Sequence, residues 1–239
     1  MKIVIIAGGL GTRIKSVTKN KIPKCMLDIN GKPLIQHQIE FFRDKGYKDF
    51  IFCIGYLGEQ IKEYFKDGSK FGVKIEYSEE PMKLGTAGAV KLIEKKIGGS
   101  CAVLYGDLLT NIDIDKMLQF HKSKKSEFTI DLRICPNGYK SSSIVLMDDL
   151  DKIDYFKENP ELNEQGYINN GIYIMNKSIF KHIPQNQKYD FAKDLIPDLL
   201  EKFIKIYGYE SKSFFRELGR PEKYEKYKKE IKGKSSIFG

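Results

Sequence analysis

The sequence predicts an α/β fold with a doubly wound, mixed and mainly parallel sheet. Three observations favour it. Apolar runs without alternation, as in residues 3–6 and 50–54, are typical of strands buried on both faces of a sheet. Segments with apolar residues at helical spacing lie between such runs, as in residues 34–45. Glycines stand directly after strand candidates, at the carboxyl ends that parallel strands share.

The first half of the chain follows this alternation closely. Residues 1–7 predict a strand, and Gly46 is the expected end of the helix at 34–45. The pattern continues with strands at 49–54, 73–77 and 101–105 and helices at 59–66 and 85–95. This order is Rossmann-like, and we expect the loops after the first and fourth strands to lie at one edge of the sheet.

The second half is less regular. Candidate strands lie at 128–134, 144–147, 167–175 and 209–218, and candidate helices at 190–205 and from 221 onward. The helix at 190–205 contains Pro197. The sequence shows no repeat, low-complexity linker or composition break. We therefore expect one domain over 1–239, with a regular half at 1–115 and a less regular half at 116–239.

The composition excludes several classes of protein. Hydrophobic residues make up 41% of the chain and aromatic residues 12%, which excludes general disorder. No apolar run approaches the roughly 20 residues that span a bilayer, so we expect no membrane partner. The four cysteines are dispersed, which disfavours a disulfide framework or structural zinc and suits a reducing cytoplasm.

The net charge of +9 raises the alternative of a basic nucleic-acid-binding module. The lysines are spread along the chain, however, and those after residue 221 alternate with glutamates, which is typical of a solvated helix face. We therefore expect no nucleic-acid partner. Steep salt-dependent binding to duplex or single strands would support the alternative.

A glycine-rich segment, Ala7-Gly8-Gly9-Leu10-Gly11-Thr12-Arg13, follows the first predicted strand. Glycines at this place let backbone N–H groups approach an anion, and the Arg13 guanidinium suits phosphate. The spacing matches neither the P-loop nor the Gly-x-Gly-x-x-Gly fingerprint. Taken alone, the glycines are equally compatible with a simple strand-to-helix turn.

Lys24 lies eleven residues beyond Arg13. A lysine held near the glycine loop can neutralise a transferring phosphoryl group. The glycine segment, followed by Pro23-Lys24-x-Met26 and Gly31-Lys32-Pro33-Leu34, resembles the sugar-1-phosphate nucleotidyltransferases. Further ordered matches cover most of the chain: Leu84-Gly85-Thr86-Ala87-Gly88-Ala89, Tyr105-Gly106-Asp107, Glu158-Asn159-Pro160, Ile168-Asn169-Asn170-Gly171, Lys193-Asp194-Leu195-Ile196-Pro197 and Phe215-Arg216-Glu217-Leu218-Gly219-Arg220-Pro221-Glu222.

The resemblance implies a role for each matched position. Arg13 and Lys24 would be catalytic, and Asp107 and Glu217 would hold Mg²⁺ as the cofactor. The implied nucleotide-binding residues are Ala7, Gly8, Gly9, Gly11, Thr12, Gly85, Thr86 and Asp107. The implied sugar-binding residues are Gly106, Glu158, Asn169 and Lys193. Residues 1–115 would form a nucleotide-binding half, and 116–239 a sugar-binding half with the C-terminal helix.

Two positions depart from the family pattern. Asn159 stands where the family has the lysine that binds the sugar phosphate, and Lys157 or Lys212 is a candidate to compensate. Glu217 stands where the family commonly has Asp. Asp107 has a simpler interpretation as a turn or helix cap, which the other motifs outweigh.

The implied reaction is nucleotidyl transfer from a nucleoside triphosphate to a sugar 1-phosphate, giving a nucleotide-sugar and pyrophosphate. The segment 80–89 is most similar to heptose- and mannose-1-phosphate guanylyltransferases, which favours GTP. Residues 23–26 and 31–56 are also similar to cytidylyltransferases, so a cytidylyltransferase or another pairing of triphosphate and sugar stays open. A catalytically silent regulatory homologue that binds nucleotide-sugar is a further alternative.

The resemblance is also compatible with a homo-oligomer, since family members are often dimers or tetramers. Since the sequence stops near residue 239, we expect no C-terminal left-handed β-helix of the kind that longer relatives carry.

Overall fold

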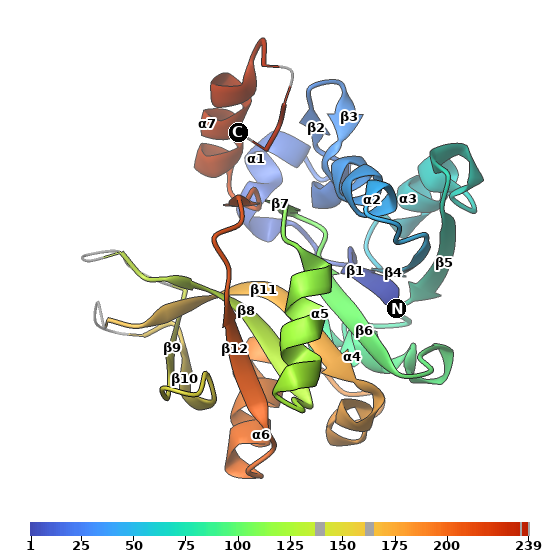
Figure 1. Ribbon diagram of the computed structural model, residues 1–239. Helices are drawn as coiled ribbons and strands as arrows, with labels where there is room; N and C mark the ends of the chain where they lie inside the picture. Colours follow the sequence, from blue (N-terminus) through green and yellow to red (C-terminus); the bar gives the residue numbers. More distant parts are fainter. Residues whose placement is uncertain (137–141, 161–164, 235, 239) are drawn as a thin grey trace. The chain divides into compact units, whose positions relative to one another are not determined.

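The computed structural model describes residues 1–136, 142–160, 165–234 and 236–238 (Figure 1). The chain forms two compact units. The first unit contains Met1–Met82, Leu104–Ile112 and Ser213–Gly239, and the second contains Lys83–Val103 and Asp113–Lys212. These units do not follow the predicted division at residue 115, because each is assembled from segments distant in sequence. The prediction of a single domain stays a prediction.

The first unit contains a parallel three-stranded arrangement of β1 (Lys2–Ile6), β4 (Asp49–Ile54) and β5 (Lys74–Glu79). Ile3 pairs with Phe50, and Phe50 pairs in turn with Ile75. The predicted apolar strands are indeed buried, since residues 3–5 of β1 are 0% exposed. Helices α2 (Leu34–Asp44) and α3 (Gly58–Phe65) connect the strands in sequence, as the periodicity predicts.

Smaller elements complete the first unit. Strands β2 (Asp28–Ile29) and β3 (Lys32–Pro33) form one antiparallel pair, and β7 (Leu108–Thr110) and β13 (Phe215–Glu217) form another. Helices α1 (Lys15–Thr18) and α7 (Pro221–Ile231) lie in the same unit. An apolar cluster joins these elements: Ile14, Leu27, Ile29, Leu34, Leu109, Leu218, Tyr224, Tyr227 and Ile231.

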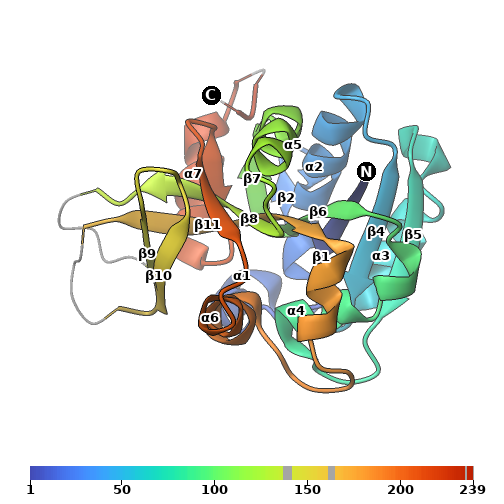
Figure 2. The same cartoon turned by 60° about the horizontal axis from the view of Figure 1, so that its bottom comes forward.

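In the second unit, the described strands that lie wholly within it follow the spatial order β12 (Ile206–Glu210), β8 (Phe128–Ile134), β11 (Tyr167–Asn176), β9 (Ser143–Met147) and β10 (Ile153–Glu158). The β12–β8 pair is parallel and the others are antiparallel. Figure 2 shows β9 and β10 side by side. The helices of this unit are α4 (Gly85–Lys91), α5 (Ile114–Ser123) and α6 (Ile196–Glu201). Strand β6 (Ser100–Tyr105) begins in this unit and ends in the first.

The predicted α/β class with mixed, mainly parallel strands is confirmed, and the predicted irregularity of the second half has a structural basis in its antiparallel pairs. Two predicted elements are wrong in detail. The strand predicted at 209–218 is two strands, because β12 pairs with β8 whereas β13 pairs with β7. The helix predicted at 190–205 starts as a π-helical turn, Phe191–Leu195, and ends at Glu201.

All four cysteines are free and buried. Within the described part of the chain, no helix is both long and apolar enough to cross a bilayer.

Candidate functional site

The glycine segment lies at the end of β1, as predicted. Ala7 is buried and its N–H donates to Cys53 O at 2.7 Å, which holds the end of the strand against β4. Gly11 has φ +62°, a left-handed conformation that glycine adopts without strain. The chain then enters a 3₁₀ turn, Thr12–Ile14, on which the side chains of Thr12 and Arg13 are exposed to solvent.

Gly8 is required by a close contact. A Cβ at this position would lie 2.3 Å from Glu80 Oε1 and 3.1 Å from Gly55 N. The carboxylate of Glu80 therefore lies directly against the backbone of the glycine segment at Gly8. In the sequence Glu80 is only the first residue of the segment 80–89, and no local pattern indicates a role for its carboxylate.

Lys24 lies against the glycine segment. Its Cε is 3.3 Å from the position that a Gly9 Cβ would take, and its Cβ is 3.6 Å from that of Gly11. Its Nζ donates to Asp107 Oδ2 at 2.6 Å. The two side chains are 19% and 5% exposed, so this ion pair is largely shielded from water. The neighbouring Cys25 thiol stays protonated, since burial raises its pKa to about 12.

Backbone contacts on both sides fix the position of Asp107. Gly106 N donates to Ile6 O at 2.9 Å, and a Cβ on Gly106 would lie 3.1 Å from Cys25 Cβ. Asp107 O accepts a hydrogen bond of 2.9 Å from Leu218 N. Asp107 is therefore held between the end of β1 and the segment that contains Glu217.

Glu217 and Asp107 converge on Gly219. A Cβ on this glycine would lie 2.5 Å from Glu217 Oε1 and 2.6 Å from Asp107 Oδ2, so glycine is the residue that fits between the two carboxylates. Gly219 N donates to Glu217 Oε1 at 3.1 Å. Glu217 Oε2 accepts a hydrogen bond from Lys223 Nζ. The register of β13 with β7, in which Glu217 pairs with Leu108, places the two acids side by side.

The described residues contain no group of three or more His, Cys, Asp or Glu side chains arranged to hold a metal ion. Two converging carboxylates nevertheless fit Mg²⁺, because this ion is usually bound through one or two carboxylates and takes further ligands from water and substrate phosphates. Because Gly219 has no side chain, the space between the two carboxylates is not filled by a Cβ, which is consistent with binding of Mg²⁺ there.

The predicted nucleotide-binding residues Gly85 and Thr86 lie at the start of α4, in the second unit. Gly85 has φ +73°, and a Cβ there would lie 2.8 Å from Tyr189 O. Thr86 N donates to Asp190 Oδ1 at 3.0 Å, and the amides of the next two residues both donate to Tyr189 O at 2.9 Å. These N–H groups are therefore bonded to residues 189–190, which stabilise the first turn of α4.

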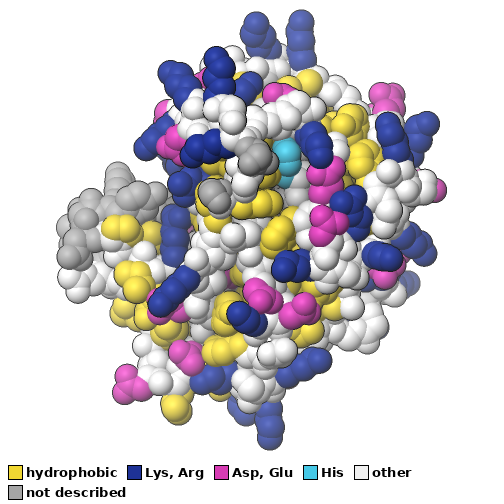
Figure 3. Space-filling view, turned by 45° about the horizontal axis from the view of Figure 1, so that its top comes forward, with side chains coloured by type: hydrophobic (Ala, Val, Ile, Leu, Met, Phe, Trp, Pro, Cys, Tyr) yellow, Lys and Arg dark blue, Asp and Glu magenta, His cyan; other side chains and the backbone are white. Residues whose placement is uncertain are grey.

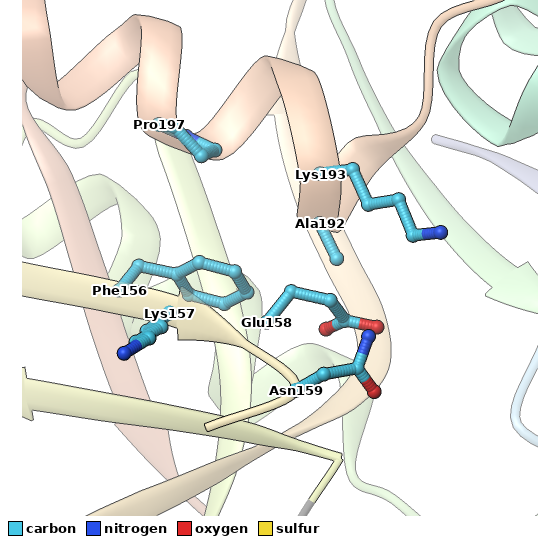
Figure 4. Close-up of a pocket in the computed structure, with 7 residues that line it drawn as sticks. All are labelled: Phe156, Lys157, Glu158, Asn159, Ala192, Lys193 and Pro197. Carbon is cyan, nitrogen blue, oxygen red and sulfur yellow. The ribbon is translucent and has the colours of Figure 1, made fainter. Parts of the chain in front are cut away.

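An open hollow of about 420 Å³ lies at the end of β10 (Figure 4). The carboxylate of Glu158 and the amide of Asn159 point toward one another, and Lys157 points to the opposite side of the strand. Lys193 comes from the π-helical turn that precedes α6. The lining residues are Phe156, Lys157, Glu158, Asn159, Ala192, Lys193 and Pro197.

The side chain of Asn169 forms hydrogen bonds with residues of its own strand, β11. Its Oδ1 accepts from Gly171 N at 2.8 Å, and its Nδ2 donates to Tyr173 Oη at 2.9 Å. Its backbone N donates to Ser143 Oγ at 3.1 Å, and Ser143 is the register partner of Glu158. Ser143 therefore stands between the two predicted sugar-binding residues.

Comparison with known proteins shows the family to which this chain belongs. The family model described as nucleotidyl transferase matches residues 2–233. The chain belongs to the nucleotidyl transferase family. The resemblance inferred from the motifs, and the prediction that the chain is an enzyme of this kind, are thereby confirmed.

Relatives of this nucleotidyl transferase differ in the base and sugar that their names specify. The chain is 36% identical over 224 residues to D-glycero-alpha-D-manno-heptose 1-phosphate guanylyltransferase of Campylobacter jejuni, covering 94% of this chain and 97% of the relative. It is 34% identical over 223 residues to UTP–glucose-1-phosphate uridylyltransferase of Synechocystis, covering 87% of this chain. The match spans 57% of the length of that relative.

A solved structure has the same fold as this nucleotidyl transferase. HddC from Yersinia pseudotuberculosis, complexed with GMP-PN, is 29% identical and superimposes with a TM-score of 0.81. The alignment covers 96% of this chain and 99% of that one.

The second unit of this nucleotidyl transferase also contains a buried polar pair that no sequence pattern indicates. Asp131 and Asn170 are 0% and 3% exposed, and Asn170 Nδ2 donates to Asp131 Oδ2 at 2.8 Å. Among the described residues, neither Asp131 Oδ1 nor Asn170 Oδ1 has a hydrogen-bond partner. Burial raises the pKa of Asp131 to about 7, because ionisation would place a charge in the interior.

The predicted site residues thus fall into two groups. The first unit brings together the glycine segment, Lys24, Gly106, Asp107 and Glu217. The second unit contains Gly85, Thr86, Glu158, Asn169 and Lys193, of which Glu158 and Lys193 line one hollow.

Proposed function

We propose that this protein transfers a guanylyl group from GTP to a heptose or mannose 1-phosphate, with release of pyrophosphate. The observation that carries the proposal is the shielded Lys24–Asp107 ion pair beside the glycine segment. The ammonium group of Lys24, the carboxylate of Asp107 and the glycine backbone lie together at the end of a parallel strand. This is the place where α/β proteins bind nucleotides. The name of the 36% identical Campylobacter relative supports the guanylyl group and the sugar class, and the GMP-PN in the complex of the Yersinia structure supports a guanine nucleotide.

In the proposed reaction an oxygen of the sugar 1-phosphate attacks the α-phosphorus of GTP. The new P–O bond forms as the bond from the α-phosphorus to the bridging oxygen breaks, and that oxygen leaves with its electron pair on pyrophosphate. The attacking phosphate is already anionic near neutral pH, so no general base is required. The work of the protein is to position the reactants and stabilise charge.

Lys24 would stabilise the negative charge that develops at the α-phosphate. The exposed guanidinium of Arg13 would bind the departing pyrophosphate through its charged fork. Ala7, Gly8, Gly9, Gly11 and Thr12 would lie along the triphosphate, since the small residues let the backbone approach it closely.

Asp107 and Glu217 would hold Mg²⁺, which when bound neutralises phosphate oxygens. The convergence of both carboxylates on Gly219 supports this assignment. Glu217 has one more methylene than the Asp of the family pattern. The hydrogen bond from Gly219 N to Oε1 turns its longer side chain back toward Asp107.

Glu80 supports the choice of GTP. Guanine presents two adjacent N–H donors on its pairing edge, and a carboxylate can accept both. Adenine lacks this pair of donors and cytosine has one amino donor beside acceptors. A carboxylate against the backbone of Gly8 is therefore suited to guanine. Gly85 and Thr86 would contact the nucleotide through the exposed surface of the turn that residues 189–190 stabilise.

The hollow in the second unit is the proposed site of the sugar phosphate. Glu158 would accept hydrogen bonds from sugar hydroxyls, and Asn169 would offer the amide hydrogen left after its bond to Tyr173. Lys193 is the cation positioned to replace the lysine absent at Asn159, since Lys157 points to the other side of β10. Gly106 would allow close approach of the sugar to the chain beside Asp107.

Two alternatives are tested together with this proposal. A silent homologue would bind nucleotide-sugar without turnover, and a cytidylyltransferase would prefer CTP. A nucleic-acid-binding module has little support on the face in Figure 3, where acidic side chains lie among the Lys and Arg side chains. We also propose a cytoplasmic location, which is consistent with the four buried cysteine thiols. A separate proposal is that the protein forms homo-oligomers.

The test is pyrophosphate release in the presence of Mg²⁺, with each common nucleoside triphosphate combined in turn with mannose, heptose and glucose 1-phosphates. We expect release with GTP and a manno-configured sugar. Release only with another pair would overturn the base or sugar assignment. Binding of nucleotide without release in any combination would favour the silent homologue.

Glu80→Gln tests the base assignment separately. The amide can accept one guanine donor and must oppose the other, so kcat/KM for GTP should fall by about tenfold or more relative to the other triphosphates. Glu63→Gln, at an exposed position of α3, makes the same change of side chain in the same unit and is the matched control. An unchanged preference in Glu80→Gln would remove this residue from base recognition.

A further inference from the structure

Lys223 lies in the first turn of helix α7 and donates to Glu217 Oε2. The two side chains are 42% and 21% exposed. Neither the family motifs nor the proposed reaction assigns this lysine a role.

The position of Lys223 is unfavourable for the helix itself. The N-terminal turn of a helix carries a partial positive charge, which favours acidic side chains and disfavours cations. Lys223 stands in that turn of an eleven-residue helix. The interaction that compensates is therefore with Glu217, six positions earlier in the chain.

Lys223 completes a balanced arrangement of charge. Asp107 and Glu217 both direct an oxygen at Gly219, and two carboxylates so close repel one another when both are ionised. Each also has an ammonium group: Lys24 on Asp107 and Lys223 on Glu217. Two positive charges thus neutralise two negative charges, as one divalent cation would.

We propose that Lys223 is the resting counter-cation of Glu217, which a divalent cation must displace to bind between Glu217 and Asp107. The inference rests on the proposed function, which assigns these two carboxylates to Mg²⁺. Its consequence is that Lys223 lowers the affinity of the nucleotide-free protein for divalent cations.

The test is binding of Mn²⁺ to the metal-free, full-length protein without nucleotide, followed through the electron paramagnetic resonance signal of free Mn²⁺. Lys223→Gln removes the charge, and Lys229→Gln removes a charge from an exposed position on the same helix as the matched control. We expect Lys223→Gln to bind Mn²⁺ about two- to fivefold more tightly than wild type, the range of a partly exposed ion pair. Lys229→Gln should bind as wild type does.

Equal or weaker binding by Lys223→Gln would overturn the inference. Asp107→Asn and Glu217→Gln distinguish this failure from failure of the proposed function. If they weaken Mn²⁺ binding while Lys223→Gln does not strengthen it, the metal assignment stands and the counter-cation role falls. If they bind Mn²⁺ as wild type does, the metal assignment falls and the inference falls with it. Pyrophosphate release by wild type reports on the reaction independently of either result.

Discussion

Lys24 Nζ donates to Asp107 Oδ2 at 2.6 Å, although the residues are 83 positions apart in the chain. This ion pair joins the 3₁₀ turn Lys24–Met26 to the residues that follow the end of β6. Since Asp107 is 5% exposed, its charge depends on Lys24 for compensation. The same two groups are the proposed centre of charge stabilisation, so stability and catalysis should respond differently to changes in them.

Removing either member of the pair should abolish most turnover. We expect Lys24→Met and Asp107→Asn each to lower kcat by about 10²-fold or more, because each removes charge stabilisation from the proposed transition state. Lys24→Met should also cost about 1–3 kcal/mol of folding free energy, since it leaves a buried carboxylate unpaired. Pyrophosphate release and urea unfolding measure the two effects.

The double variant separates these effects. Lys24→Met combined with Asp107→Asn should recover part of the lost stability, because no unpaired charge remains, while turnover stays low. Additive losses of stability would show that the two charges do not compensate each other.

Gly8→Ala should weaken nucleotide binding. The added Cβ would lie 2.3 Å from Glu80 Oε1 and 3.1 Å from Gly55 N, so the loop or Glu80 must move. Gly98→Ala is the matched control, since a Cβ there meets nothing within 4 Å. We expect at least a tenfold loss of GTP affinity in calorimetry for Gly8→Ala and none for Gly98→Ala. Equal affinities would argue against close approach of the nucleotide to Gly8.

Asp131 should make folding stability depend on pH. Its folded pKa is raised to about 7 from an ordinary 3.8, so the folded state retains a proton that the unfolded state has lost. The contribution of Asp131 is therefore most favourable below pH 4 and is lost as the pH rises through 7. Relative to Asp131→Asn, wild type should lose about 1–3 kcal/mol between pH 5 and pH 8.

Chemical unfolding of both proteins at each pH measures this difference, and other titrating groups cancel in the comparison. A pH-independent difference would mean that Asp131 ionises normally in the folded protein.

Lys193 should determine the KM for the sugar phosphate. Lys193→Ala should raise this KM by about tenfold with a smaller effect on kcat, since it removes a charge from binding rather than from the α-phosphate. Lys157→Ala, on the other side of β10, should have little effect. The opposite result would make Lys157 the compensating lysine.

Asn159→Lys restores the residue of the family pattern and should lower the KM. Its backbone has φ +51°, which asparagine tolerates better than lysine does, so the variant should also be less stable by about 1 kcal/mol. Thermal unfolding and steady-state kinetics measure the two changes. A raised KM would show that the hollow does not hold the phosphate.

Local patterns were sufficient to predict much of the fold. The runs that became β1 and β4 contain consecutive apolar residues, and α2 has apolar residues at helical spacing, so each could be recognised without its neighbours. The pattern does not predict β10, because two exposed residues, Asp154 and Tyr155, separate its buried Ile153 and Phe156. Helix α5 is not predicted either, although its Asp113 cap is a local signal. The boundary between β12 and β13 could not be found, because it depends on which strands they join.

The α/β class, the family and the candidate residues Lys24, Asp107 and Glu217 can be recognised without a structure, because motifs and periodicity are local properties of the chain. Which side chains contact one another, by contrast, depends on how the chain folds. The contact of Glu80 with Gly8, the convergence on Gly219 and the pairing of Asp131 with Asn170 all join residues distant in sequence. Such contacts depend on strand register and packing, and in the last of them burial raises the pKa of Asp131.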